Sequence, residues 1–458
     1  MQIWAFVGGN NDAKRTQAGK TWKSGRRLQT GRGWAILLEK ELVLFKEDFP
    51  VFGKKTTQLP KLGIYIHIPF CRSKCDYCDF YSLAGKEDRM AEYQKALLSH
   101  IRETAPLAEG YQVDTVYFGG GTPSFYGEKY QRELLSTIKK SYKMASDAEI
   151  TMEANPDSVD YKALKALRKE GFNRISMGMQ SACPAELEAI HRPHTARQVD
   201  QALADARKAG FRNISLDLIY GLPGQTMESW KETVEHALSL VPQHLSCYGL
   251  KVEEGTPLAK RVEEGEVLPD DDLQADLYLW TVGRLTRAGY PQYEISNFAK
   301  PGFHSRHNLR YWKGQPYVGF GPGAHSDFGG RRYSFVRDLE GYVDGVLRGG
   351  TILDEDDLIG QRERGGEYLM LRLRTCEGVE EWEYRRCSYM DFAPIRARLE
   401  EFAQKGWAVE EEGRWHLTPE GFLLSNQLIG DLLERQEESR LETLIPRARE
   451  FFSSEEEG

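Results

Sequence analysis

The feature that most constrains the fold is a regular alternation of short β-rich runs and helical stretches from residue 63 to residue 249. Apolar, β-branched runs bounded by turn residues predict strands. The six candidates are Gly63 to Ile68, Val113 to Phe118, Ala148 to Glu153, Arg174 to Met177, Ile214 to Tyr220 and His244 to Gly249. Strand–helix–strand repetition predicts a parallel sheet and an α/β fold. It favours a partial (β/α)6 TIM-like barrel, although a doubly wound sheet fits the same pattern.

The spacers between these runs carry the apolar periodicity of amphipathic helices. The helices predicted there span Arg89 to Thr104, Glu128 to Met144, Tyr161 to Glu170, Ala196 to Ala209 and Met227 to Leu240. Gly171 and Gly210 directly follow two of them, where glycine commonly ends a helix. Past Pro269 we expect a helix at 271–288, a strand at 293–298 and then an irregular region to residue 330.

The chain has 458 residues, too many for one ordinary core, so a large and a smaller domain are expected. We predict a disordered basic extension over residues 1–60, a barrel with the irregular region over 61–330, a C-terminal module over 331–440 and an acidic tail over 441–458. Helices at 367–373, 393–404 and 419–433 with a hairpin near 407–417 make that module a winged-helix-like α+β domain. Residues 1–62 hold twelve Lys or Arg against five Asp or Glu, which fits either a basic arm or an unstructured leader.

Composition and charge argue against membranes and nucleic acids as binding partners. The longest apolar runs fall far short of the roughly 20 residues that cross a bilayer, so we expect no stable membrane insertion. No apolar run follows a basic start near Met1, which favours a cytoplasmic location. The net charge of −8 gives no electrostatic reason to expect nucleic-acid binding, and residues 410–412 make the hairpin of the C-terminal module acidic. We therefore expect that module to be a lid or a partner surface.

Three of the seven cysteines, Cys71, Cys75 and Cys78, form a CxxxCxxC pattern directly after the first predicted strand. Thiolates select zinc, copper(I) or iron–sulfur clusters, and a structural zinc site requires a fourth Cys or His that the local sequence does not offer. A [4Fe–4S] cluster held by only three cysteines leaves one iron open to an external ligand. The loop follows the end of a strand, on the face where barrel active sites lie.

Residues Tyr65-Ile-His-Ile-Pro-Phe-Cys71 and the CxxxCxxC loop resemble the radical S-adenosylmethionine superfamily, particularly the group of oxygen-independent coproporphyrinogen oxidases and haem chaperones. The resemblance spans roughly residues 61 to 435. It implies a partial radical-SAM barrel whose [4Fe–4S] cluster is held by Cys71, Cys75 and Cys78. It further implies that S-adenosylmethionine chelates the open iron, and that the reduced cluster can split it to release a 5′-deoxyadenosyl radical.

Further residues match segments that contact S-adenosylmethionine in that superfamily. A glycine run lets backbone amides approach a ligand closely, the ends of barrel strands converge on one site, and an arginine suits the cofactor's carboxylate. The alternatives are an ordinary packed tyrosine, buried ion-pair members and a surface arginine. The contacts that the resemblance implies are Tyr65, Tyr77, Gly121, Thr122, Glu153, Gln180, Arg192 and Asp217.

Position 80 discriminates between the two members of this group. The oxidases resemble CxxxCxxCxC, with a further cysteine two residues after the third, whereas this chain has Phe80 there. This favours a carrier that binds haem and delivers it to apoproteins over an enzyme that decarboxylates coproporphyrinogen III. A radical enzyme acting on an unrelated substrate is a third possibility. Reduction of the cluster would need a donor such as a flavodoxin or ferredoxin.

A second motif supports the carrier. His307-Asn-Leu-Arg-Tyr311-Trp312 resembles the HNxxYW pattern associated with haem binding in the haem chaperones, and neutral imidazole is a common axial ligand of haem iron. The competing interpretation is a hydrogen-bonded loop histidine with Trp312 packed at a domain interface. We take His307 as the candidate haem ligand, with His304 and His325 as alternatives.

Overall fold

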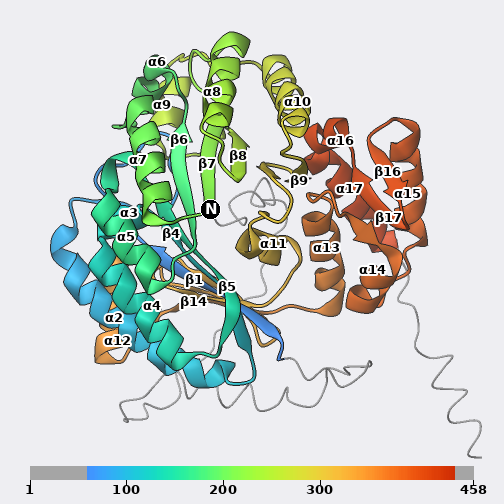
Figure 1. Ribbon diagram of the computed structural model, residues 1–458. Helices are drawn as coiled ribbons and strands as arrows, with labels where there is room; N and C mark the ends of the chain where they lie inside the picture. The colour runs from blue at the N-terminus through green and yellow to red at the C-terminus, as the bar shows by residue number, and fades with distance from the viewer. Residues whose placement is uncertain (1–58, 439–458) are drawn as a thin grey trace, which may run out of the picture.

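The computed structural model describes residues 59–438, where one long sheet dominates the fold (Figure 1). All but the last two residues of the predicted N-terminal extension, and the whole acidic tail, lie outside this range. The sheet runs in the order β14 (Leu353–Leu358), β13 (Arg331–Phe335), β12 (His325–Phe328), β11 (Tyr317–Phe320), β1 (Lys61–Ile68), β4 (Gln112–Gly120), β5 (Met144–Ala154), β6 (Arg174–Gln180), β7 (Asn213–Tyr220), β8 (His244–Gly249), β10 (Asn297–Ala299) and β9 (Gln292–Glu294).

The six predicted strands are the central ones, β1 and β4 to β8, and they pair in parallel in the order of the sequence. A doubly wound sheet would reverse its strand order, so the arrangement is that of a partial barrel, as predicted. The sheet does not close, because β11 and β12 extend one side and β10 and β9 the other. The helices that connect the central strands are α2 (Met90–Thr104), α3 (Pro123–Tyr126), α4 (Glu128–Ser141), α5 (Tyr161–Glu170), α6 (Pro184–Ala189), α7 (Ala196–Ala209) and α8 (Met227–Ser239).

Local sequence explains where the crossover helices begin and end. Asp160 and Thr195 accept backbone N–H groups at the first turns of α5 and α7, as N-cap residues do. Gly171 and Gly210 end the same helices with positive φ angles of 122° and 101°, which confirms the two predicted stop positions.

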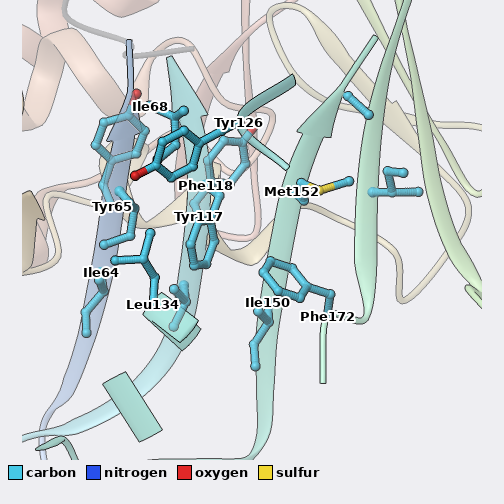
Figure 2. Packing of buried hydrophobic residues seen from close by; sticks show 14 of the residues in the cluster. Ile64, Tyr65, Ile68, Tyr117, Phe118, Tyr126, Leu134, Ile150, Met152 and Phe172 are labelled. Atoms are coloured by element: carbon cyan, nitrogen blue, oxygen red, sulfur yellow. The ribbon is translucent and has the colours of Figure 1, made fainter. Parts of the chain in front are cut away.

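The core lies between the convex face of the sheet and these helices. Ile64 and Ile68 of β1 are fully buried in it, and Figure 2 shows them near Phe118 and Leu134. Side chains alternate along a strand, so the intervening residues of β1 point to the concave face. There they line a cavity instead of packing against helices.

The segment after β8 differs from the sequence prediction in two places. The single strand expected at 293–298 is two short antiparallel strands, β9 and β10, because the chain reverses where the Glu294 carboxylate accepts the backbone N–H of Ser296 at 2.8 Å. The region expected to be irregular up to residue 330 contains the helix α11 (Arg306–Trp312) and the strands β11 and β12. The helices α9 (Pro257–Glu263) and α10 (Asp271–Arg287) precede this segment.

The helix α11 lies between the sheet and the C-terminal helices (Figure 1). The Glu149 carboxylate of β5 accepts its first two backbone N–H groups, at 3.1 and 3.0 Å. The Arg310 guanidinium pairs with Asp114 of β4 and also donates to a backbone carbonyl before β11. These contacts fix α11 to the early residues of β4 and β5, at the end of the barrel away from the cluster loop.

The division expected at residue 330 falls inside the sheet, because β12 and β13 pair across it and β14 continues the sheet to Leu358. The helix α12 (Leu339–Arg348) packs on the same body, against α2. A second core follows, with its own three-stranded sheet. Its elements are α13 (Gln361–Arg372), β15 (Val379–Glu380), α14 (Glu381–Ser388), α15 (Ala393–Gln404), β16 (Ala408–Glu411), β17 (Arg414–Leu417), α16 (Pro419–Leu423) and α17 (Ser425–Glu438). No helix within residues 59–438 is long and apolar enough to span a membrane.

Candidate functional site: a cavity at the open end of the barrel

A cavity of about 680 Å³ lies on the concave face of the sheet. Its walls come from the cysteine loop after β1, from the inward-facing residues of the parallel strands and from β12 to β14. All three cysteines and all eight residues expected to contact S-adenosylmethionine line this one cavity. The strands thus bring together residues that are spread from position 65 to position 217 of the sequence.

The cysteine loop is held against the neighbouring strand ends. Cys71 closes β2 (Phe70–Cys71), which pairs with β3 (Leu83–Ala84). The Thr122 hydroxyl donates to Cys71 Sγ at 3.3 Å, and Arg192 Nη1 donates to Cys75 Sγ at 3.3 Å. Burial raises the pKa of the Cys71 thiol to about 11, although the Thr122 bond opposes this. These donors favour sulfur ligands that carry negative charge, as thiolates bound to iron do.

The donor set suits a cluster better than a single ion. Within residues 59–438, no three Cys, His, Asp or Glu side chains converge closely enough to hold one metal ion, the three loop cysteines included. A [4Fe–4S] cluster takes each thiolate on a different iron and therefore needs no such convergence. The nearby histidine His67 is engaged elsewhere, with Nε2 2.8 Å from the carbonyl oxygen of Tyr81 and Nδ1 3.2 Å from the Tyr65 hydroxyl.

The glycine run after β4 packs directly on this loop. The backbone N–H of Gly121 donates to Ile68 O, and that of Thr122 donates to Phe70 O, each at 2.8 Å. A Cβ atom at position 121 would lie 2.9 Å from Cys71 Sγ, closer than carbon and sulfur approach without contact strain. Glycine is therefore required here for the loop and the strand end to meet.

Two carboxylates face the middle of the cavity. Glu153 accepts the Tyr117 hydroxyl at 2.8 Å and the backbone N–H of Gly120 at 3.3 Å. Both carboxylate oxygens of Asp217 lie 3.0 Å from the donating Ser176 hydroxyl, and Oδ1 also accepts the Ser215 hydroxyl at 3.3 Å. Burial raises the pKa of Asp217, while hydroxyl donors oppose the shift. Carboxylates held in this way can accept hydrogen bonds from the hydroxyl or amino groups of a ligand.

The remaining candidates lie at the rim near the cysteines. Arg192 also donates through Nη2 to Asn155 Oδ1 at 3.0 Å and to the Gly178 carbonyl at 3.3 Å. Tyr77 is partly buried against a small apolar cluster beside the loop. Gln180 ends β6 with a φ angle of 63°, a strained conformation for a residue with a side chain.

The three histidines proposed as haem ligands lie in different surroundings. His307 is only 1% exposed and does not line the cavity. Its Nδ1 is 2.9 Å from the Thr115 hydroxyl, its Nε2 is 2.9 Å from the Tyr311 hydroxyl, and its ring stacks on Tyr117. Both nitrogens are therefore occupied by protein groups. The ring is hydrogen-bonded, as in the competing interpretation, but it stands in the helix α11 packed on the sheet and not in a loop.

His304 stacks on Tyr293, with ring centroids 4.3 Å apart, and is also outside the cavity. His325 starts β12 and does line the cavity, half-buried. Burial lowers the pKa of His325, which keeps the ring neutral near pH 7. Within residues 59–438, no group forms a hydrogen bond with either ring nitrogen of His325. Of the three histidines, only His325 has a ring that is free and faces the cavity.

Several residues on the cavity wall are not among those predicted from the sequence. Arg174, Ser176 and Ser246 point inward from β6 and β8 and line the cavity. Their signal was the alternation of polar and apolar residues in strands such as Arg174-Ile-Ser-Met-Gly178. A barrel strand is ordinarily apolar on both faces, so inward polar residues indicate a ligand-binding lumen.

A smaller cavity of about 210 Å³ lies between the barrel end and the C-terminal domain, and shares Tyr248 and Asn308 with the first. Trp312 of α11 and Phe422 of α16 line it, next to the buried carboxyl group of Glu294. Burial raises the pKa of Glu294 to about 8, although the backbone N–H of Ser296 opposes the shift. This carboxyl group is therefore mostly protonated at neutral pH.

That raised pKa predicts a pH-dependent stability. The folded protein binds the Glu294 proton up to a pH of about 8, whereas the unfolded chain loses it near its ordinary value of 4.5. The stabilisation is complete below pH 4.5 and is lost as the pH rises through about 8. Between these two pH values the free energy of unfolding of wild type should fall by about 1.4 kcal/mol per pH unit relative to that of Glu294→Gln, measured by urea denaturation. Parallel stability curves for the two proteins would contradict the prediction.

Comparisons with known proteins agree with this architecture. The family profile "Radical SAM superfamily" matches residues 65–237, and the profile "HemN C-terminal domain" matches residues 359–424. The second match begins just after β14, where the large sheet ends. The solved structure of coproporphyrinogen III oxidase (HemN) from Escherichia coli is similar with a TM-score of 0.72 at 25% identity, covering 83% of this chain and 91% of that one.

The curated relatives are similar along almost their whole length. "Heme chaperone HemW" of Bacillus subtilis (strain 168) is 36% identical over 375 residues, which cover 81% of this chain and 98% of the relative. The protein of the same name from Escherichia coli (strain K12) is 36% identical over 378 residues, with the same coverage. The chain therefore belongs to the HemW family within the radical S-adenosylmethionine superfamily.

Proposed function

We propose that this protein is a haem chaperone, which binds haem, holds a [4Fe–4S] cluster with S-adenosylmethionine and delivers haem to apoproteins. The observation that carries the proposal is the cysteine loop itself. It supplies three thiols to the cavity and places Phe80, also on the cavity wall, where the oxidases have a further cysteine. The names of the relatives and the length over which they match support the same function.

In this proposal Cys71, Cys75 and Cys78 would each hold one iron of the cluster, and the fourth iron would supply the open coordination position for S-adenosylmethionine. The glycine run at Gly121 and Thr122 would lie beside the methionine end of S-adenosylmethionine, and Arg192 would lie near its carboxylate. The bound cofactor pair supplies a site for reductive cleavage of the sulfonium. The other contacts around the cofactor would be Tyr65, Tyr77, Glu153, Gln180 and Asp217.

For haem itself we infer that His325 is the axial ligand. It has a neutral imidazole on the cavity wall, which suits haem iron. Phe80 also lines the cavity and can pack on a porphyrin face. Binding at His307 would require breaking two hydrogen bonds and withdrawing α11 from the sheet. This assignment changes the role expected for the HNxxYW motif. The motif would not bind haem directly, and its helix α11 would instead pack against the strands that line the cavity.

The alternative function is that of an oxygen-independent coproporphyrinogen III oxidase, and it is favoured by the similarity to the HemN structure. One assay separates the two. The cluster is reconstituted without oxygen in the full chain, and the protein is given S-adenosylmethionine, a reductant such as reduced flavodoxin, and coproporphyrinogen III. A carrier leaves the porphyrinogen unchanged, and haem titration of the same protein produces a saturable shift of the haem absorption. Formation of protoporphyrinogen IX would overturn the carrier proposal.

Two further results of this experiment are informative. Release of 5′-deoxyadenosine without porphyrin conversion would indicate a radical enzyme with another substrate, if haem also failed to bind. Transfer is tested by mixing the haem-loaded protein with a haem-accepting apoprotein and separating the two. Haem that stays on the loaded protein under all conditions would contradict the delivery step.

A further inference from the structure

The first residue of β6 is a buried arginine for which the proposed function gives no role. Arg174 is 1% exposed and lines the main cavity from the end of β6 opposite the cysteine loop. Its Nε and Nη1 atoms are buried and have no hydrogen-bond partner in the part of the chain that the structure describes. Buried charges are normally paired, because a guanidinium removed from water loses its hydration. The lumen therefore presents donors that lack an acceptor.

The carboxylates nearest to Arg174 are occupied by other donors. Glu149 accepts the first two backbone N–H groups of α11, at 3.1 and 3.0 Å. Asp217 accepts the hydroxyls of Ser176 and Ser215, at 3.0 and 3.3 Å. Burial is the largest single influence on the pKa of the Arg174 guanidinium and lowers it, but Glu149, Asp217 and the nearby tyrosines together keep that pKa above its ordinary value. The arginine is thus charged and attracted by its neighbours, yet none of them fills its hydrogen-bonding positions.

We propose that Arg174 anchors a carboxylate-binding site at the floor of the barrel lumen. A carboxylate accepts two parallel charge-assisted hydrogen bonds from the planar guanidinium. Glu149, Glu153 and Asp217 weaken the attraction for a small diffusing anion. We therefore expect the carboxylate to belong to a larger ligand, which also binds to other walls of the cavity.

Two ligands of this protein could present such a group. S-adenosylmethionine has a carboxylate, but that group is expected to chelate the open iron near the cysteine loop. Gln180, at that end of β6, lies about 20 Å from Arg174 along an extended strand. Haem carries propionate side chains, and one of them can reach into the lumen while the iron lies nearer the rim. The position of Arg174 favours the propionate, and this choice of source rests on the proposed function.

Haem, haem dimethyl ester and S-adenosylmethionine distinguish these sources when each is titrated into the reconstituted full chain. Wild type should bind haem about 10- to 100-fold more tightly than the ester, the effect of one charge-assisted pair. Arg174→Gln should remove that difference and leave the affinity for S-adenosylmethionine unchanged. Arg174→Lys keeps the positive charge but lacks the planar pair of N–H donors. Its preference for haem over the ester should lie between that of wild type and that of Arg174→Gln. Sodium acetate, a free carboxylate, should not compete with haem.

A matched control is Arg372→Gln, since Arg372 is also a buried arginine but is paired with Glu377 and Glu383 in the C-terminal domain. It should lower the melting temperature without changing any ligand affinity. If Arg174→Gln weakens S-adenosylmethionine binding and spares haem, the carboxylate belongs to S-adenosylmethionine. If Arg174→Gln and Arg174→Lys bind all three ligands within about twofold of wild type, the site is refuted. Wild type that binds no haem refutes the proposed function instead, and the S-adenosylmethionine titration still tests the site.

Discussion

Replacing Cys75 with alanine should abolish the cluster. The iron content after anaerobic reconstitution should fall from about four per chain to near zero, and the visible absorption of the cluster should disappear with it. The reason is that the loop offers only three thiols, so two remaining ligands leave two irons without protein contact. S-adenosylmethionine binding should be lost too, because its anchoring iron is absent.

Cys183→Ala is the matched control for that experiment. Cys183 precedes α6 and does not line the cavity, so its loss should leave both iron content and the spectrum unchanged. Both variants should unfold at similar urea concentrations when compared without iron. A Cys75→Ala protein with a normal cluster spectrum would overturn the assignment of the loop.

His307→Ala should have the second large effect, on stability rather than on haem coordination. It removes a buried ring, takes from the Tyr311 hydroxyl its bond to His307, leaves the Thr115 hydroxyl with Arg310 Nε as its remaining partner and opens a space beside Tyr117. The combined loss should lower the free energy of unfolding by about 2–4 kcal/mol, measured by urea denaturation of the protein without haem.

His325→Ala is expected to give the opposite result. Its ring is half-buried and makes no hydrogen bond in the described part of the chain, so the free energy of unfolding should change by no more than about 0.5 kcal/mol. The haem spectrum should instead lose the features of histidine coordination. If His307→Ala stays fully stable and loses haem, while His325→Ala binds haem normally, the ligand is His307 and our assignment is wrong.

The strands of the barrel were predictable because their signals are local. The run Gly63 to Ile68 is apolar apart from His67, and Gly171 and Gly210 mark helix ends by their own backbone preferences. The end of the large sheet was not predictable in the same way. The strand β14 has the sequence Leu-Asp-Glu-Asp-Asp-Leu, mostly exposed, and joins the sheet only because β13 offers it an edge.

The residues of the candidate site likewise differ in whether the sequence alone could identify their role. CxxxCxxC is a local pattern whose chemistry follows from its residue types, so Cys71, Cys75 and Cys78 were identifiable without a fold. The HNLRYW segment was equally visible, but its residue types do not say which way its side chains face. Only the packing of α11 on β4 and β5 shows that His307 bonds to Thr115 and Tyr311 inside the structure.

The sequence by itself determined the order of the six central strands and their connecting helices, the three sulfur ligands and the absence of a cysteine at Phe80, because each depends on residues close together in the chain. The tertiary structure alone decided which side chains share the cavity. It brought His325 to the cavity wall, removed His307 from it and left Nε and Nη1 of Arg174 without an acceptor among residues 59–438. The physical reason is that burial and hydrogen-bond pairing arise between strands far apart in sequence, and no local pattern records them.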